Sequence, residues 1–411
     1  KKNKNLDYFY PTNVLVTAYD IIFFWVARMI FSGIEFMNEV PFTEVLIHGI
    51  VRDNQGRKMS KSLGNGVDPL VLIDKYGADA LRFSLASGIA PGSDTRYSDE
   101  KIESCRNFMN KLWNASRFVI MNLGDEQAEI PARLNVSDKW ILTRLNSVIR
   151  DVTINLNKYE VGLASAKLYD FVWSEFCDWY IELAKGGLLG EDAQRKAAVR
   201  AVLSYVLSGL LRMLHPFMPF LTETVYAFLP GCEEASCMLS DWPRAEEIPF
   251  FPAQEAQMEG IMEIIRAVRN LRAEMNVQAG HKARLMIRPV DGWQDAVGGA
   301  EVFFQRMASA SELDVLAKDQ AVTEKTVGAV VAAGEILIPL GDLVDIDKEI
   351  ARLNKERDNL LKEIARAEGK LNNEGFLRKA PEALVQAERD KLAANQTKLT
   401  ALDARIADLK Q

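Results

Sequence analysis

The stretch at residues 48–69 reads HGIVRDNQGRKMSKSLGNGVDP, and the rest of the chain is best interpreted outward from it. Lys58 and Lys61 alternate with the hydroxyls of Ser60 and Ser62, and glycines lie on both sides of them. Glycines allow such a loop to bend and to close over a ligand. Ammonium groups and hydroxyl donors on one loop suit the binding of a polyphosphate. A short lysine pair of this kind can also be a solvated surface turn.

The residues around this loop alternate between strand and helix patterns. Apolar runs predict strands at 13–17 and 44–51, with a helix at 20–32 between them. Two further short helices are predicted at 69–76 and 79–87. Strand, helix, strand is the order of a parallel α/β layer. Residues 1–97 hold too few strands for a complete doubly wound sheet, so we expect half of such a domain.

Residues 98–275 have helical periodicity throughout. Over 161–183, apolar residues follow one another at steps of three and four, which is the spacing of one helix face. The prolines of 215–219 end one helix and start another. A helical bundle is the expected packing. Residues 276–341 differ, because two strand patterns flank a helix pattern, and they predict a small α/β element.

Residues 342–411 carry heptad repeats. Over 346–371 and 385–409, apolar positions recur at alternating steps of four and three, and turn residues separate the two runs. This pattern predicts an antiparallel coiled-coil hairpin. Residues 346–411 hold 14 Lys and Arg against 12 Asp and Glu, whereas the whole chain has a net charge of −7. A spacer, a dimerisation arm and an arm that touches an anionic partner all fit.

Composition excludes several classes of protein. With 411 residues, 48% of them hydrophobic, we expect a folded multidomain chain rather than a disordered one. The net charge excludes a uniformly basic nucleic-acid binder but allows local basic faces. Apolar runs such as 21–26 are too short to span a bilayer, and the start is not a signal peptide. Four cysteines give no disulfide framework, which favours the cytosol. The absence of a G-x-x-x-x-G-K-[ST] string excludes a P-loop NTPase.

Several motifs together resemble a known family. Residues 58–62 read KMSKS after a strand ending in HG, which resembles the second signature of the class I aminoacyl-tRNA synthetases. Residues 10–30 look like the strand and helix that line the amino-acid pocket in the valyl members. The segments 111–118 and 215–220 are similar to the anticodon-binding bundle of that family, and the terminal hairpin looks like its tRNA-binding arm.

The resemblance implies a mainly α, multidomain chain. Its parts would be the C-terminal half of a class I nucleotide-binding α/β fold, a helical anticodon-binding bundle, a small α/β element and an antiparallel coiled-coil hairpin. The implied activity is that of a ligase that activates valine with ATP and Mg²⁺ and transfers it to tRNA. The implied partners are tRNA(Val), ATP and L-valine, and we expect a cytoplasmic monomer without a membrane.

Site residues follow from the positions that match the family's motifs. Lys58 and Lys61 would be catalytic, since they would neutralise the triphosphate as the valine carboxylate attacks the α-phosphate. The expected ATP-binding residues are His48, Gly49, Lys58, Met59, Ser60, Lys61 and Ser62. The expected substrate pocket is formed by Asp20, Ile21 and Trp25, with Asp20 on the ribose. Asn65 would steady the loop. Ile21 and Trp25 can also be read as core residues.

Contacts with tRNA are expected in two places. Lys111, Asn114 and Phe118 share one helix face and would meet the anticodon, although Phe118 is equally suited to a core position. Arg378 and Lys379, in the connection between the heptad runs, would contact tRNA in the arm. No metal-ligand set is expected.

The chain departs from the family pattern in two respects. The first class I signature, HIGH, is missing, because the three histidines lie too far apart in sequence to form it. Ala18 stands where the family usually has glycine. We therefore expect a C-terminal part of the enzyme that begins inside the catalytic domain, lacks the editing domain and is inactive alone. The alternative is a non-catalytic tRNA-binding module.

Overall fold

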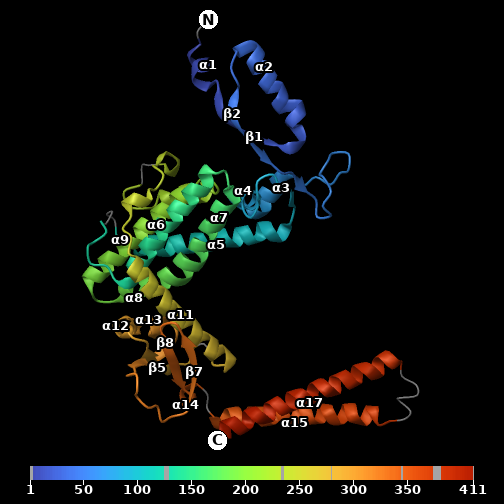
Figure 1. The fold of residues 1–411 in the computed structure, drawn as a ribbon, viewed down its shortest axis with the longest axis vertical. Coiled ribbons are helices and arrows are strands. Elements are labelled where there is room, and N and C mark those ends of the chain that lie inside the picture. Colours follow the sequence, from blue (N-terminus) through green and yellow to red (C-terminus); the bar gives the residue numbers. More distant parts are fainter. Residues whose placement is uncertain are drawn as a thin grey trace. The chain divides into compact units, whose positions relative to one another are not determined.

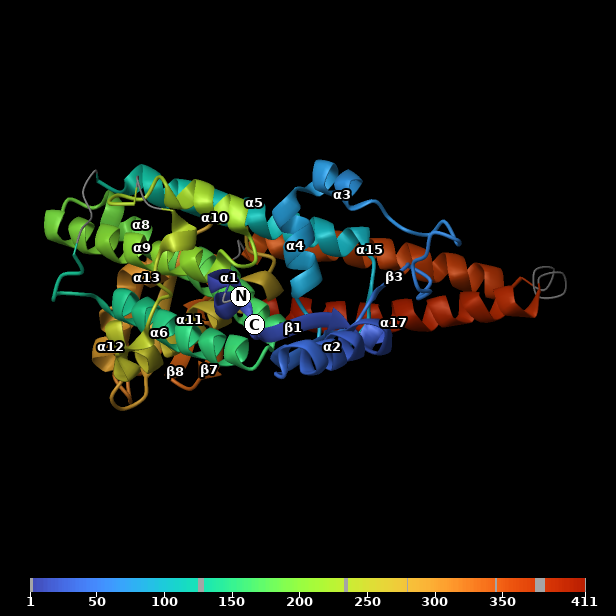
Figure 2. The same ribbon diagram turned by 90° about the horizontal axis from the view of Figure 1, so that it is seen from above.

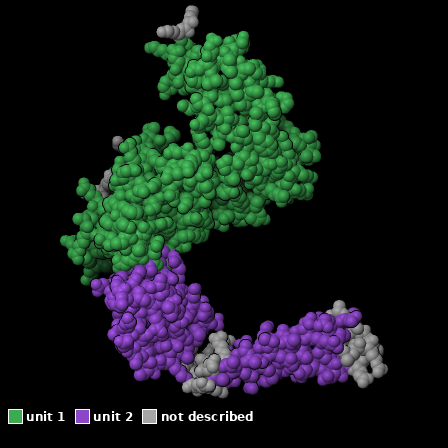
Figure 3. Space-filling view, in the orientation of Figure 1, with its two compact units in different colours: residues 1–259 green, residues 260–411 purple. Residues whose placement is uncertain are grey.

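The computed structural model describes residues 3–124, 129–232, 236–278, 280–343, 346–373 and 381–410. These residues form two compact units, Lys1–Glu259 and Gly260–Gln411 (Figure 3). Helices dominate both units (Figure 1), which confirms the prediction of a mainly α, multidomain chain.

The first unit opens with a small parallel α/β layer. Its elements are α1 (Lys4–Phe9), β1 (Thr12–Ala18), α2 (Ala27–Met37), β2 (Phe42–His48), β3 (Val51–Arg52), α3 (Pro69–Tyr76), α4 (Ala78–Ala86) and β4 (Thr95–Arg96). Strand β1 pairs in parallel with β2, and Ala18 at its end lies opposite His48. The predicted order of strand, helix and strand is confirmed. Because the pairing is parallel, the segments that follow β1 and β2 leave from the same edge.

The helix predicted at 20–32 is only partly α-helical. Tyr19–Ile21 is a 3-10 turn and Ile22–Val26 is a π-helix, so the α-helix begins after them. Ile21, with φ −115° and ψ 13°, lies outside the helical region and separates the turn from the π-helix. An apolar pattern with steps of three to five residues fits all three helix types, which is why the sequence could not distinguish them.

The remainder of the first unit is a helical bundle, as predicted. Its helices are α5 (Asp99–Asn122), α6 (Val136–Asn157), α7 (Val161–Asp170), α8 (Ile181–Leu189), α9 (Ala193–Leu214), α10 (Pro219–Tyr226) and α11 (Pro252–Glu274), the last of which continues into the second unit. The apolar stripe over 161–183 is continuous because a π-helix at Phe171–Tyr180 joins α7 to α8. Leu168, Val172 and Phe176 on this stripe are fully buried.

Helix α9 forms part of the bundle core. Within the described residues it is the one helix long and apolar enough to cross a membrane, but 67% of its apolar window is buried in the protein. Val202, Val206 and Leu210 on this helix are fully buried. Packing against the neighbouring helices therefore accounts for its composition.

Helix α4 fastens the α/β layer to the bundle at the turn between α9 and α10. Arg82 donates from Nη2 to the carbonyl of Pro216 at 3.0 Å, just after the end of α9. The buried carboxylate of Asp79 accepts from the amide of Leu221 at 2.7 Å, at the start of α10. A cation at a helix carboxyl end and an anion at an amino end each match the partial charge there. This junction fixes α4 to the bundle.

The second unit begins with a four-stranded sheet. Its elements are β5 (Ala283–Pro289), α12 (Gln294–Gly298), α13 (Glu301–Met307), β6 (Ala310–Val315), β7 (Thr326–Val331), β8 (Gly334–Pro339) and α14 (Leu340–Leu343). The strand order is β6-β5-β8-β7, with β5 and β6 parallel and the other pairs antiparallel. The expected small α/β element is present, but only β5 and β7 were predicted. β6 reads ASELDV, and its charged residues hide the strand pattern.

The chain ends in an antiparallel helical hairpin of α15 (Ile346–Leu371) and α17 (Glu382–Lys410) (Figures 1 and 2). Three polar pairs fix its direction, because residue numbers fall on one helix as they rise on the other: Arg357 with Asp403, Glu363 with Asn395, and Lys370 with Glu388. Leu353, Leu402 and Ile406 form the apolar core, with Leu360 packed against it. The predicted hairpin is confirmed.

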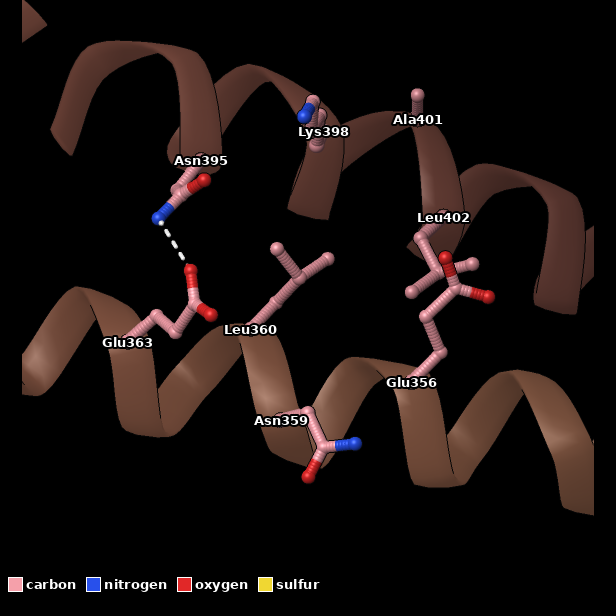
Figure 4. A pocket seen from close by; sticks show the side chains of 8 residues that line it. All are labelled: Glu356, Asn359, Leu360, Glu363, Asn395, Lys398, Ala401 and Leu402. Carbon is pink, nitrogen blue, oxygen red and sulfur yellow. Dashed lines mark hydrogen bonds between the residues drawn. The ribbon is translucent and has the colours of Figure 1, made fainter. Parts of the chain in front are cut away.

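A shallow groove crosses the hairpin near its middle (Figure 4). Leu360 and Leu402 point into the space between the two helices, and Asn395 donates from Nδ2 to Glu363 at 3.3 Å. Asn395 is buried and occupies a heptad position, where one polar residue helps to specify the register. Arg378 and Lys379 lie in the connection 374–380, outside the described residues.

Candidate functional site

The candidate site lies where β1 and β2 end. Asp20 follows β1 in the 3-10 turn, and the loop with Lys58 follows β2 and β3. The ammonium of Lys58 donates to Oδ2 of Asp20 at 2.7 Å. This hydrogen bond lowers the pKa of the Asp20 carboxyl and raises the pKa of Lys58. Two residues that are 38 positions apart in sequence, both of them expected site residues, are thus brought together.

Asn65 holds the loop from inside. Its Oδ1 accepts from the amide of Ser60 at 3.0 Å, and its Nδ2 donates to the carbonyl of Lys58 at 3.3 Å and to Oδ2 of Asp53 at 2.9 Å. The hydroxyls of Ser60 and Ser62 lie 3.1 Å apart. The backbone between Lys58 and Asn65 is therefore tied to one side chain, as expected for a residue that steadies the loop.

Lys61 differs from Lys58 in its surroundings. Lys61 and Ser62 are exposed, and Met59 is half-buried. Across the part of the chain that the structure describes, no hydrogen bond or ion pair engages the ammonium of Lys61. One lysine of the pair is thus already bound to a carboxylate of the site, and the other extends into solvent.

Asp94 is a site residue that sequence reasoning missed. Its carboxylate accepts from the amide of Ile50 at 2.8 Å, from Nε of Arg52 at 2.6 Å and from the hydroxyl of Tyr19 at 3.1 Å. The amide of Ile50 and then the guanidinium of Arg52 lower the pKa of Asp94. This carboxylate joins the turn after β1 to the start of β3. Nothing in its sequence neighbourhood, PGSDTR, distinguishes it from an ordinary turn residue.

Gly49 has a steric reason to be glycine. A Cβ atom there would lie 2.1 Å from the carbonyl oxygen of Ser93, so no side chain fits. The adjacent ring of His48 is exposed and places Nδ1 2.7 Å from the carbonyl of Gly49. The predicted contact of both residues with ATP stays a prediction.

The apolar side chains expected to line the substrate pocket are not buried in this structure. Ile21 is half-buried in the 3-10 turn, and Trp25 in the π-helix is 56% exposed. Phe23 and Phe24 are more exposed still, at 82% and 68%. These apolar side chains follow Asp20 directly in the sequence. Whether Ile21 and Trp25 contact valine stays a prediction.

On α5, two of the residues expected to meet the anticodon, Lys111 and Phe118, already contact other side chains of the bundle. The ammonium of Lys111 donates to Asp178 at 2.6 Å and lies 3.7 Å from the ring centroid of Trp173. Asn114 is exposed, and Phe118 is half-buried with the ammonium of Lys185 at 5.6 Å from its ring. Lys111 therefore forms an ion pair with Asp178 and a cation–π contact with Trp173 in this structure.

A stacked aromatic pair beside Lys111 was also missed by sequence reasoning. The rings of Tyr169 and Trp173 lie 5.7 Å apart with an interplanar angle of 12°. The two residues are four positions apart, a spacing that places both side chains on one helix face, so the sequence did contain the signal. Among the described residues, no group of three His, Cys, Asp or Glu side chains could hold a metal ion.

Three family models match separate parts of the chain. The model for class I tRNA synthetases (I, L, M and V) matches residues 1–98, the anticodon-binding domain of tRNA ligase matches 138–287, and the valyl tRNA synthetase tRNA binding arm matches 345–410. Together they cover the α/β layer, most of the bundle and the hairpin.

Similar proteins give a consistent result. The valine–tRNA ligase of Clostridium acetobutylicum is 52% identical over 100% of this chain and 47% of its own length. That of Bacillus subtilis is 48% identical over 98% of this chain and 46% of its own length. The chain thus spans about half the length of these relatives. Among solved structures, a leucyl-tRNA synthetase of Agrobacterium radiobacter K84 in a ternary complex is similar with a TM-score of 0.49 and 25% identity, covering 58% of this chain and 29% of that one.

Proposed function

Because this chain belongs to the valine–tRNA ligase family, we propose that it supplies the ATP-closing loop and the tRNA-binding parts of such an enzyme. In this proposal residues 1–97 complete the catalytic domain, 98–275 bind the anticodon region, 276–341 link, and 342–411 form the tRNA arm. The enzyme would activate L-valine with ATP, which brings Mg²⁺ as its counterion, and transfer valine to tRNA(Val). We propose a monomer in the cytoplasm.

The observation that carries the proposal is the contact of Lys58 with Asp20 at the ends of β1 and β2. In open α/β sheets, ligands bind outside the carboxyl ends of the strands, which is where this pair lies. Asp20 would take the ribose hydroxyls of ATP, and this exchange would free Lys58 for the phosphates. His48, Gly49, Met59, Ser60 and Ser62 would line the nucleotide.

The loop lysines would act on the transition state. As the valine carboxylate attacks the α-phosphate, negative charge grows on the phosphate oxygens and pyrophosphate leaves. Lys58 and Lys61 would stabilise that charge, and Ser60 and Ser62 would donate hydrogen bonds. The solvent-exposed position of Lys61 suits a group that moves onto the substrate when the loop closes.

Recognition of the two other substrates would use apolar and basic surfaces. Ile21 and Trp25 would pack on the isopropyl group of valine. In the bundle, Lys111, Asn114 and Phe118 would face the anticodon, with Lys111 exchanging Asp178 for a phosphate. Arg378 and Lys379 would contact tRNA phosphates from the arm.

The test is valine-dependent ATP–pyrophosphate exchange, measured on the complete ligase that contains this chain and on the chain alone. We expect exchange by the complete enzyme and none by the chain alone, because the HIGH signature, which would supply the opposite wall of a class I ATP site, does not occur in this sequence. Robust exchange by the chain alone would contradict this. Retained tRNA binding without exchange by the complete protein would favour a non-catalytic tRNA-binding module.

A further inference from the structure

Asp53 is a buried carboxylate inside an otherwise exposed loop. It is 5% exposed, whereas both lysines and most of their neighbours in the loop are exposed. Buried carboxylates need several hydrogen bonds to compensate for lost hydration. Asp53 is not among the expected site residues, yet its burial inside this loop indicates that it has a role there.

The two oxygens of Asp53 bind both sides of the loop. Oδ1 accepts from the amides of Gln55 at 3.0 Å and Arg57 at 2.7 Å. Oδ2 accepts from Nε of Arg57 at 2.8 Å and from Nδ2 of Asn65 at 2.9 Å. The amide of Asp53 also donates to the carbonyl of Arg57 at 2.9 Å. One carboxylate thus closes the turn 53–57 and also holds the far end of the loop.

Lys58 lies between these two attachments. The preceding residue, Arg57, is fixed by Asp53, and the carbonyl of Lys58 itself accepts from Asn65. The amide of Ser60 also binds Asn65. The backbone that carries Lys58 is therefore held on both sides, and this directs its ammonium to Asp20. Lys61 lies between Ser60 and Asn65, and its carbonyl accepts a longer bond from the amide of Gly64 at 3.3 Å, while its side chain is exposed.

We propose that Asp53 and Asn65 form a clamp that fixes the backbone of Lys58 before ATP binds, while the exposed side chain of Lys61 remains free to move. Asp53 is then a positioning residue that acts through Asn65 and Lys58. This assignment rests on the proposed function as far as ATP is concerned, whereas the clamp itself can be tested without any activity.

The first test is limited trypsin digestion of the chain, with the peptides quantified by mass spectrometry. Cleavage of a native loop follows the population of its open form. We expect the intact chain to be cut faster after Lys61 than after Lys58. Asn65→Ala and Asp53→Asn should raise cleavage after Lys58 by about tenfold or more, since hydrogen bonds to a charged group shift an opening equilibrium by that order. Cleavage after the exposed Lys391 of α17 is the internal reference.

Two matched controls separate the clamp from general damage. Asp68→Asn alters a loop aspartate that caps α3 through the amide of Leu70 at 2.9 Å, and asparagine caps equally well. Asn54→Ala alters the exposed neighbour of Asp53. Neither should change cleavage after Lys58, and the thermal midpoint of every variant should stay near that of the intact chain.

A double variant tests the pairing itself. Asp53→Asn places two amide donors against each other, and Asn65→Asp places two carboxylates together. The double change Asp53→Asn with Asn65→Asp restores one donor facing one acceptor. We expect its cleavage after Lys58 to be closer to that of the intact chain than either single variant. Purely additive effects, or unchanged cleavage in the single variants, would overturn the clamp.

The second test uses the complete ligase. Asn65→Ala should lower the rate of valyl-adenylate formation at saturating ATP, with valine affinity nearly unchanged, and the double variant should recover part of the rate. Faster cleavage with an unchanged rate of adenylate formation would overturn Asp53 as a positioning residue of the reaction. If the wild-type ligase shows no exchange, the proposed function fails, and the digestion still reports on the clamp.

Discussion

The hydrogen bonds that Asp53 accepts hold the pKa of its carboxyl below the ordinary value. The bond from Asn65, followed by those from the amide and side chain of Arg57, lowers its pKa from 3.8 to about 2. A carboxyl whose pKa is lower in the folded protein stabilises the fold above its ordinary pKa. This contribution is lost as the pH falls through about 2.

A carboxyl titration followed by carbon NMR measures the pKa of Asp53 directly. We expect the Asp53 resonance to titrate near 2 in the intact chain and closer to 3.8 in Asn65→Ala, since the largest cause of the shift is removed. Asn54→Ala serves as the control and should leave the midpoint in place. A midpoint that stays the same in Asn65→Ala would mean that Asn65 does not hold the carboxylate.

Asp138 in the bundle is a second buried carboxylate, and its contribution is to stability. It is fully buried and accepts from Tyr180 at 2.9 Å and from Nη2 of Arg195 at 3.0 Å. We expect Asp138→Ala to lower the free energy of unfolding of the bundle by about 3–5 kcal/mol, because it leaves a partly buried guanidinium without its anion. Urea unfolding followed by tryptophan fluorescence measures this loss.

Asp151 provides the comparison for Asp138. It pairs with Lys167 at 3.0 Å, but both side chains are about half exposed. Solvent screens such a pair, so Asp151→Ala should cost about 1 kcal/mol or less. Equal losses in the two variants would show that the buried cluster does not stabilise the bundle more than a surface pair does.

At the scale of elements, the apolar periodicity of the sequence predicted those helices whose buried face produces that periodicity. The stripe through Leu168, Val172 and Phe176 was found because this side of the helix packs on other elements. β6 was missed because its SELD residues look like a turn, and pairing with β5 decides its structure. The π-helix after Ile21 was missed because a one-residue change of helix pitch leaves the apolar pattern nearly unchanged.

Within the candidate site, some residues were predicted from the sequence and others were missed, for a different reason. Lys58, Lys61 and Asn65 are recognisable because their motif is long and contiguous. The bonds of Asp53 lie within its own loop, but its burial is not visible in the sequence. Asp94 acts through hydrogen bonds to the amide of Ile50 and to side chains that are far away in sequence. Such bonds depend on where the chain folds back, and no local pattern records them.

The hairpin of α15 and α17 is the element with the clearest independent test. Deleting residues 346–411 should weaken tRNA binding by the complete ligase and leave valine activation nearly intact. This segment has more basic than acidic residues, opposite to the rest of the chain. If it contacts phosphates, the salt dependence of tRNA binding should flatten by roughly one unit per lost contact.

If the hairpin were instead a dimerisation arm, deleting residues 346–411 would have a different result. The mass in solution would change, and the salt slope would not. Sedimentation, run beside a salt series of tRNA affinities, therefore separates the two. Equal affinities and equal slopes for the intact and deleted enzymes would remove the support for a tRNA contact.

At the scale of the whole molecule, the first unit carries the loop at the strand ends and the helical bundle, and the second unit carries the arm. Within the first unit, helix α4 is held on the bundle through Asp79 and Arg82. The catalytic claim nevertheless depends on the lysine that has no partner in the described structure. If Lys61 acts on the growing charge of the phosphates, it must affect the chemical step more than ATP binding.

The most direct measurement is the single-turnover rate of valyl-adenylate formation by the complete ligase at saturating ATP and valine. For Lys61→Ala, the account predicts a loss of about 10²–10³-fold in this rate, typical of removing one preorganised donor, with a much smaller change in ATP affinity. Lys391→Ala, which alters an exposed lysine of the arm, should match the wild-type rate. An unchanged single-turnover rate in Lys61→Ala would contradict the account, because a lysine in an ordinary solvated turn would give that result.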